Sequence, residues 1–181
     1  MLLNPSLSQM LSHPDLPNFL VTINAKDLMM NPKTDRETRD QLLKLQCLYD
    51  FELFVQMFFP HYLQYPFSQM HRDIFQLEKD PTRGKRRDAI AAPRGHAKTA
   101  FFTLFKVIHA IVYGYEQYIV IFSHSEPEAL SKVKDILREL QTNVALQQIY
   151  GHLAPSKGSS KDFRTSNGIR VQAKSQGQQV R

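Results

Sequence analysis

The segment Ala92-Pro93-Arg94-Gly95-His96-Ala97-Lys98-Thr99 decides the fold that the sequence predicts. It lies between Asp88–Ala92, a short apolar run typical of a strand, and Lys98–Tyr113, a long apolar run typical of a buried helix. Its Lys-Thr pair has the spacing of the phosphate-binding pattern GxxxxGK(S/T), with alanine at both glycine positions. Residues Pro93 to Thr99 therefore predict a binding site for the phosphates of a nucleotide, and an ordinary helix start is the alternative.

Each residue type in this loop suits a triphosphate. Backbone N–H groups in the turn and in the first helical turn attract an anion, and the helix dipole favours negative charge there. We expect Lys98 to reach the β- and γ-phosphates of ATP and the Thr99 hydroxyl to bind Mg²⁺. Arg94 adds a second cation, and Gly95 accepts a positive φ without strain. His96 either faces phosphate or shapes the turn.

The segments after this loop alternate in the manner of a parallel α/β sheet. Tyr118–Phe122 is a continuous apolar run, which predicts a strand covered on both faces. Ser125 and Glu128 have the spacing of a capping box and predict a helix over residues 126–140. Asn167-Gly168 lies between two short apolar runs and predicts a hairpin.

The segments before the loop predict an irregular arm and then helices. Thr34 and Glu37 form a second capping box, which predicts one helix that ends before Pro60. The predicted organisation is an N-terminal arm followed by a partial P-loop ATPase domain made of a helical lead-in, a βαβα core, and a hairpin with a tail. The arm spans residues 1–33 and the ATPase domain spans residues 34–181. Within the domain, the helical lead-in spans residues 34–79, with its second helix at 69–79. The βαβα core spans residues 88–150, and the hairpin with its tail spans residues 161–181.

The composition excludes several classes of protein. The chain has 181 residues, a net charge of +6, 42% hydrophobic residues and 22% charged residues, which fits a globular domain. Cys47 is the one cysteine, so a disulfide framework and a zinc site with paired thiolates are excluded. None of the seven histidines forms an i, i+4 pair, and no metal site of that kind is expected. We also expect an intracellular protein, because the first residues do not resemble a signal peptide.

The stretch Ala91–Thr99 resembles the variant Walker A loop of the large terminase subunit, the ATPase motor that packages DNA into the heads of tailed bacteriophages. Many members of that family carry Pro-Arg-Gly-His-(Ala/Gly)-Lys-(Ser/Thr) at this loop. Residues 118–140 look like the family's second strand and helix, and Gly177–Arg181 looks like the Gly-x-x-x-Arg segment before Walker B. The resemblance covers about Phe54 to Arg181.

The resemblance implies roles for particular residues. Lys98 and Thr99 match the family's phosphate and Mg²⁺ residues, and Arg94 matches an arginine that senses the γ-phosphate. Arg181 matches an arginine finger supplied to the nucleotide of a neighbouring subunit, where it would neutralise charge in the transition state. The alternative for Arg181 is a solvated tail residue.

An adenine-contacting segment upstream of the loop is also implied. The candidate is Pro66–His71, in which Gln69 would hydrogen-bond the base edge and Phe67 would stack on the ring. The alternative is a helix start with Phe67 in the core.

The fold that the resemblance implies is a P-loop NTPase-type parallel sheet flanked by helices, with a helical N-terminal region and an incomplete C-terminus. The function would be that of the ATP-binding part of a DNA-packaging motor, whose parent couples hydrolysis to translocation of DNA into a prohead. The implied partners are double-stranded DNA without sequence preference, the small terminase subunit, the portal protein and further copies in a ring. The implied location is the cytoplasm of an infected or lysogenic bacterium.

Hydrolysis by this chain is in doubt, because no apolar strand ending in acidic residues follows Arg181 and no nuclease cluster is present. We expect a fragment of a longer protein or a decayed prophage gene. One alternative is another P-loop, helicase-like ATPase. Another is a non-catalytic prophage remnant that binds DNA or a partner through basic loops such as residues 83–87 and the tail from Gly151.

Overall fold

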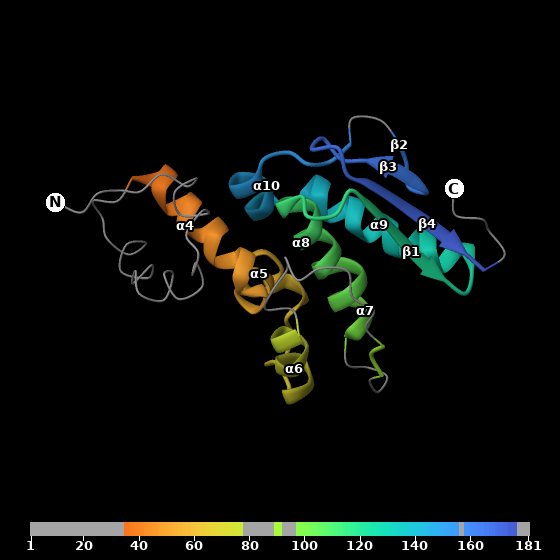
Figure 1. Ribbon diagram of the computed structural model, residues 1–181, viewed down its shortest axis with the longest axis horizontal. Coiled ribbons are helices and arrows are strands. Elements are labelled where there is room, and N and C mark those ends of the chain that lie inside the picture. The colour runs from red at the N-terminus through yellow and green to blue at the C-terminus, as the bar shows by residue number, and fades with distance from the viewer. Residues whose placement is uncertain (1–34, 78–88, 92–96, 156–157, 177–181) are drawn as a thin grey trace.

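The computed structural model describes residues 35–77, 89–91, 97–155 and 158–176, which form a mixed α/β fold (Figure 1). Among the described residues, helices come first, and a small sheet with its covering helix follows. The elements are α4 (Arg36–Tyr49), α5 (Phe51–Phe58), the 3-10 turn η1 (Pro60–Tyr62), α6 (Gln69–Leu77), α7 (Lys98–Ala100), the π turn η2 (Phe101–Phe105), α8 (Lys106–Tyr113), β1 (Tyr118–Ser123), α9 (Glu126–Thr142), α10 (Val144–Tyr150), β2 (Gly158–Ser159), β3 (Asp162–Arg164) and β4 (Arg170–Ser175).

The sheet is mixed, so the prediction of a parallel sheet is only partly right. Its strand order is β1-β4-β3-β2, with β1 and β4 parallel and the other two pairs antiparallel. The predicted hairpin at Asn167-Gly168 is confirmed and joins β3 to β4, and a short turn of this kind makes antiparallel neighbours. Gly168 has a φ of 93°, and Asn167 Nδ2 donates to the carbonyl of Ile111 at 2.7 Å, which ties the turn to α8.

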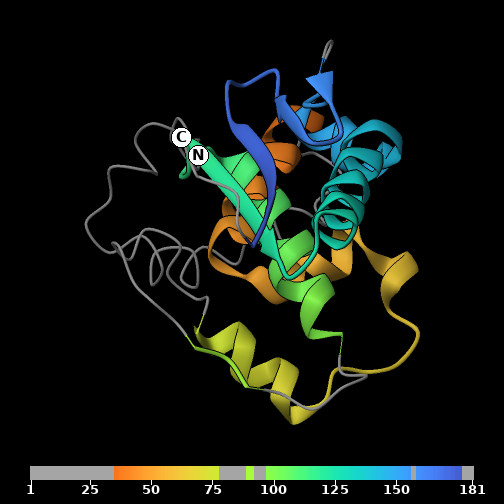
Figure 2. The same cartoon turned by 90° about the vertical axis from the view of Figure 1, so that its right-hand side faces the viewer.

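Strand β1 is buried on one face, which corrects the prediction of burial on both. Ile121 and Ser123 are buried, whereas Phe122 is 56% exposed. Helix α9 packs along both β1 and β4, and Figure 2 shows it beside the two strands. The apolar run therefore predicted the strand correctly but the covering of its second face wrongly.

The single helix predicted before Pro60 is two helices. Asp50 interrupts it: its backbone leaves the helical region, and its carboxylate accepts a hydrogen bond from Leu53 N at 2.9 Å to cap α5. A short acidic side chain competes well for backbone N–H groups, so it overrides the apolar periodicity on either side. The first helix is capped by Asp35, which accepts from Thr38 N at 2.8 Å, and not by the predicted pair that begins at residue 34.

The predicted buried helix over residues 98–113 is confirmed. Helices α7 and α8 continue into one another through the π turn η2, because the backbone keeps right-handed helical angles from Ala100 to Lys106. Gly114 ends the helix with a φ of 70°, the left-handed conformation that glycine adopts without strain.

The strand predicted at residues 88–92 is absent where the structure describes it. Residues 89–91 have no strand structure and are exposed, and Ile90 is 37% exposed. A strand is stabilised by hydrogen bonds to a neighbouring strand. Among the described strands, β1 pairs with β4 and not with residues 89–91. The prediction failed because an apolar run specifies a strand only together with its partner.

An aromatic core joins the helices to the sheet. Phe54 is fully buried, and its ring lies against those of Phe58, His109 and Tyr150. Figures 1 and 2 show α8 between α5 and the sheet. His109 of α8 is 3% exposed and lies inside this core.

Helix α9 begins at the predicted position, but the predicted capping hydrogen bond does not form. Ser125 is at the N-cap with extended backbone, yet its side chain makes no capping hydrogen bond. Pro127 in the first turn and the two glutamates there favour the helix start in its place.

Candidate functional site

The helix that begins at Lys98 follows a residue with an unusual backbone. Ala97 has a φ of 50° and a ψ of 14°, and it is the one non-glycine residue with a positive φ in the part of the chain that the structure describes. The left-handed conformation costs alanine on the order of 1–2 kcal/mol. Position 97 is where the phosphate-binding pattern has its second glycine, so the backbone there has the conformation that glycine provides.

The first turn of this helix presents polar groups at its open end. Lys98 is half-buried and Thr99 is exposed. Ala97 O accepts from Phe101 N at 3.1 Å, so a regular helical turn begins directly after the left-handed residue. The N–H groups of such a first turn have no helical acceptor and suit an anion.

The open end of the helix lies at the side of the sheet where β1 ends. Figures 1 and 2 both place the start of α7 near the carboxyl end of that strand. In open α/β sheets, ligands bind outside the carboxyl ends of the strands. In this mixed sheet, β1 and β4 are the one parallel pair among the described strands.

A pocket of about 430 Å³ opens beside the helix start. Ala97 and Ala100, one turn apart on the helix, form one wall. The opposite walls come from the chain before and within α6. The full lining is Tyr62, Leu63, Gln64, Tyr65, Pro66, Phe67, Ser68, His71, Ala97, Ala100, Phe101 and Phe105. Apolar and aromatic walls with a few polar groups are typical of pockets for small ligands.

The predicted adenine-contacting segment reaches this pocket in part. Phe67 lines it, but the ring of Phe67 also packs edge-on against Phe75 at 4.9 Å, as the core alternative predicts. His71 lines it as well, and its imidazole stacks on Phe101 at 4.9 Å. Gln69 is not in the lining, because its amide nitrogen donates to Asp73 Oδ1 at 2.9 Å.

Sequence reasoning missed the lining residues that precede Pro66, among them Tyr62, Gln64 and Tyr65. They come from η1 and the loop after it, where neither helical nor strand periodicity applies. The available signal was the run of aromatic and amide side chains just before Pro66. Gln64 is an exposed amide at the pocket, and an amide pairs with the donor and acceptor edge of a base.

Several predicted site residues lie outside the described residues. These are Pro93, Arg94, Gly95 and His96 of the loop, and Arg181 at the end of the chain. Ala97 lines the pocket, whereas Lys98 and Thr99 follow it at the helix start and are not part of the lining. The predicted roles of all these residues stay predictions.

The two glutamates that follow β1 are engaged with cations. Glu126 pairs with Lys161, and Glu128 accepts from Lys132 at 3.1 Å. A hydrogen bond from Ser123 is the main cause that lowers the pKa of Glu128, and the nearby Lys132 lowers it further. Both carboxylates thus pair with lysines at the start of α9.

Part of the positive charge of the tail is neutralised within the chain. Arg170 makes a two-pronged contact with Asp162, with Nη2 to Oδ2 at 2.6 Å, and this partner is the main cause that lowers the pKa of the Asp162 carboxyl. Lys161 is paired as described above. Arg170 and Lys161 of the tail are thus engaged by carboxylates of the same chain.

Comparisons with protein-family models, with curated protein sequences and with solved structures found no match to this chain. Within the described ranges, every helix is too short or too polar to cross a membrane.

Proposed function

We propose that this chain binds ATP with Mg²⁺ at the start of α7. The observation that carries the proposal is the left-handed backbone of Ala97 directly before Lys98-Thr99. That conformation turns successive N–H groups toward one point and forms an anion-binding concavity. Lys98 would contact the outer phosphates, and the Thr99 hydroxyl would be a ligand of Mg²⁺.

The adjoining pocket would take the adenine ring. Its volume of about 430 Å³ lies within the range of about 300–1,000 Å³ typical of ligand pockets. The pocket lies against Ala97 and Ala100 at the helix start. The ribose of a bound ATP would therefore connect the base in the pocket to the phosphates at the helix start. Tyr62 and Phe67 supply aromatic surface, and Gln64 supplies an amide for the base edge.

The wider role that we propose is that of the ATP-binding part of a viral DNA-packaging motor with a P-loop fold, like the large terminase subunit. The loop resemblance supports this role, together with the helix start beside the end of β1. Arg94 and Arg181 would add cations to the phosphates, the latter across a subunit boundary. The proposed partners are double-stranded DNA, the small terminase subunit, the portal protein and further copies of the chain.

The described residues support nucleotide binding more strongly than hydrolysis. Hydrolysis in this class needs a free carboxylate near Mg²⁺ and the attacking water. The carboxylates after β1 are paired with lysines, as shown above, and Gln176 is the last described residue after β4. We therefore propose that the carboxylates for hydrolysis come from outside the described part of the chain.

The proposal is tested by titrating a fluorescent ATP analogue in the presence of Mg²⁺. The Lys98→Ala substitution is expected to weaken binding by about 10- to 100-fold, because a charge-assisted hydrogen bond contributes about 1.5–3 kcal/mol. The matched control is Lys134→Ala, which removes an exposed lysine on α9 away from the pocket. This control is expected to bind as the unmodified chain does. Equal affinity of Lys98→Ala and the unmodified chain would remove the phosphate site.

Substitution of Ala97 tests the backbone conformation itself. Ala97→Gly removes the left-handed strain but loosens the unfolded chain, so the free energy of unfolding should stay the same or rise by up to about 1 kcal/mol. The same change at Ala145, within α10, should lower it by about 1 kcal/mol, the usual cost of glycine in a helix. Urea denaturation measures both values. Equal losses at the two positions would show that Ala97 does not need the left-handed conformation.

An alternative function is favoured by the irregular backbone of residues 89–91. Without a strand leading into the loop, the chain would act as a non-catalytic module that binds DNA or a protein partner. The same titration separates the two functions, because such a module has no affinity for the ATP analogue that depends on Lys98.

A further inference from the structure

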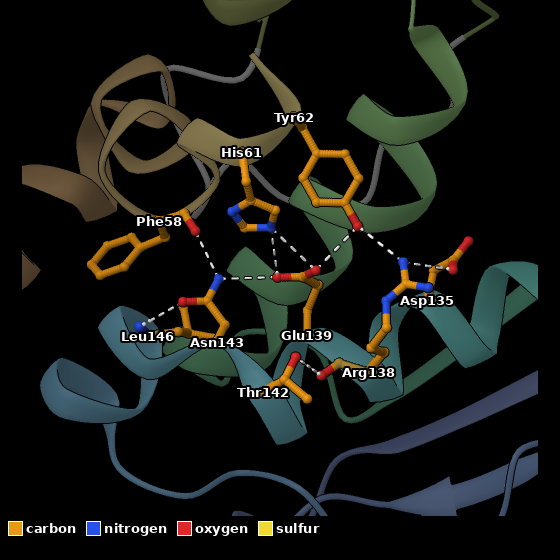
Figure 3. A network of polar contacts seen from close by, with 9 residues as sticks. All are labelled: Phe58, His61, Tyr62, Asp135, Arg138, Glu139, Thr142, Asn143 and Leu146. Carbon is orange, nitrogen blue, oxygen red and sulfur yellow. Dashed lines mark hydrogen bonds and ion pairs between the residues drawn. The ribbon is translucent and has the colours of Figure 1, made fainter. Parts of the chain in front are cut away.

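A buried carboxylate connects the wall of the pocket to α9 (Figure 3). The side chain of Glu139 is 6% exposed, and three side chains contact its oxygens. Tyr62 Oη donates to Oε1 at 3.1 Å, Asn143 Nδ2 donates to Oε2 at 3.0 Å, and His61 Nε2 lies 3.3 Å from both oxygens. An ionised carboxylate only accepts hydrogen bonds, so Nε2 is the His61 atom that would donate to it.

This arrangement explains how a buried charge is tolerated. An unpaired carboxylate away from water is strongly unfavourable, and charge-assisted hydrogen bonds offset that cost. The donors come from two separate parts of the chain, η1 and the end of α9, so Glu139 joins them. Asn143 extends the connection, since its Nδ2 also donates to Phe58 O at 2.7 Å and its Oδ1 caps α10 through Leu146 N at 3.0 Å.

Tyr62 is the residue through which this network reaches the pocket. Its hydroxyl donates to Glu139 and accepts from Arg138 Nη2 at 3.2 Å, and Arg138 is held in turn by Asp135 at 3.0 Å. The same Tyr62 ring lies edge-on to Phe105 with centroids 5.5 Å apart, and it lines the pocket. Hydrogen bonds therefore hold the Tyr62 hydroxyl, and Phe105 packs against the Tyr62 ring. Together these contacts fix the orientation of Tyr62 in the pocket wall.

We propose that Glu139 is a positioning residue that sets the selectivity of the pocket for an aromatic base by holding Tyr62 in place. This inference rests on the proposed nucleotide site. Glu139 does not line the pocket and lies at the opposite end of the Tyr62 side chain from it. Its influence is thus confined to the base, and the phosphates at Lys98 are held by other groups.

The Glu139→Gln substitution keeps the shape of the side chain but disturbs the network. One oxygen becomes an NH₂ group, which faces a donor of either Asn143 or Tyr62 and cannot accept from it. The Tyr62→Phe substitution removes the hydroxyl and keeps the ring, so it tests the same connection without leaving an altered group at position 139. Glu128→Gln is the matched control, since it alters a carboxylate at the far end of α9 whose side chain is 53% exposed.

The experiment compares the binding of Mg-ATP with that of Mg-tripolyphosphate, which has the phosphates but no base, by titration calorimetry. For the unmodified chain, ATP is expected to bind more tightly than tripolyphosphate. Glu139→Gln and Tyr62→Phe are expected to weaken ATP binding at least fivefold and to change tripolyphosphate binding less than twofold. Glu128→Gln is expected to change neither.

Other outcomes would contradict the inference, and each points to a different cause. Equal weakening of both ligands would show that Glu139 supports the fold in general, and no weakening would show that Tyr62 does not depend on it. If Glu139→Gln does not fold, Tyr62→Phe decides by the same ratio. If the unmodified chain binds tripolyphosphate and ATP equally, the pocket does not take the base, although the phosphate site remains. If it binds neither, the proposed function itself fails.

Discussion

The Phe54→Ala substitution is expected to lower the free energy of unfolding by about 3–5 kcal/mol, the usual cost of removing a buried phenylalanine. Phe54 is fully buried at the meeting point of the helices. Its ring has aromatic neighbours on three helices and the segment after α5, and the cavity cannot close without moving several of them. These neighbours are Phe51, Phe58, Phe59, His109, Tyr113 and Tyr150.

The measurement is urea denaturation of the two Phe→Ala variants at positions 54 and 122. Phe122 is 56% exposed on β1, so its removal should change the free energy of unfolding by less than about 0.5 kcal/mol. A total stability of about 5–15 kcal/mol is typical of a domain, and the loss at Phe54 is a large share of it. Similar small changes at both positions would contradict the packing of this core.

A fall in pH from 7 to 5 is expected to destabilise the fold by about 2 kcal/mol through His109. Burial is the main cause that lowers the pKa of this imidazole from 6.5 to about 4, despite its hydrogen bond to Cys47 O. The unfolded chain therefore binds a proton near pH 6.5, whereas the folded chain binds it only near pH 4. The stability is fully present above pH 6.5 and is lost as the pH falls through that window.

The hydrogen bonds of His109 fix the neutral form. Nε2 lies 2.9 Å from Cys47 O, which only accepts, so the proton is on Nε2. Nδ1 then accepts from the Tyr115 hydroxyl at 2.9 Å. Cys47 is in the last turn of α4, whose carbonyls lack a full set of helical donors, and His109 supplies one of them.

The control for this pH dependence is His109→Gln. Its denaturation should change less between pH 7 and pH 5 than that of the unmodified chain, whatever its stability at pH 7. The lowered pKa values of Asp35, Glu128 and Asp162 also couple stability to pH, but carboxyl groups with ordinary values of 3.8 to 4.5 act mostly below pH 5. Equal slopes in the two proteins, or an NMR titration of the ring near pH 6.5, would contradict a buried neutral His109.

Local chemistry in the sequence predicted the elements whose boundaries depend on few residues. The helix over residues 98–113 was predicted at both ends, because a Lys-Thr start and a glycine stop act within one turn. The break at Asp50 was missed, because one capping side chain outweighed an apolar pattern that continued past it. Residues 89–91 were wrongly predicted as a strand, since a strand depends on a partner elsewhere in the chain.

The candidate site was predicted to a smaller extent, for the same reason. Ala97, Lys98 and Thr99 are adjacent in the chain, so a short motif identifies them. The pocket depends on Tyr62, which is positioned by Glu139, a residue 77 positions away. No local sequence pattern spans so many residues, so the pocket could be recognised only from the tertiary contacts.

The π turn at Phe101–Phe105 sets the direction in which the start of the helix faces. An α-helix advances by about 100° per residue, so the extra residue in the π turn shifts the angular phase between the two ends of the helix by about 100°. In an uninterrupted helix, Lys98 would be in phase with the buried residues Phe105 and His109. The added residue brings it into phase with Lys106 instead, whose side chain is half-buried.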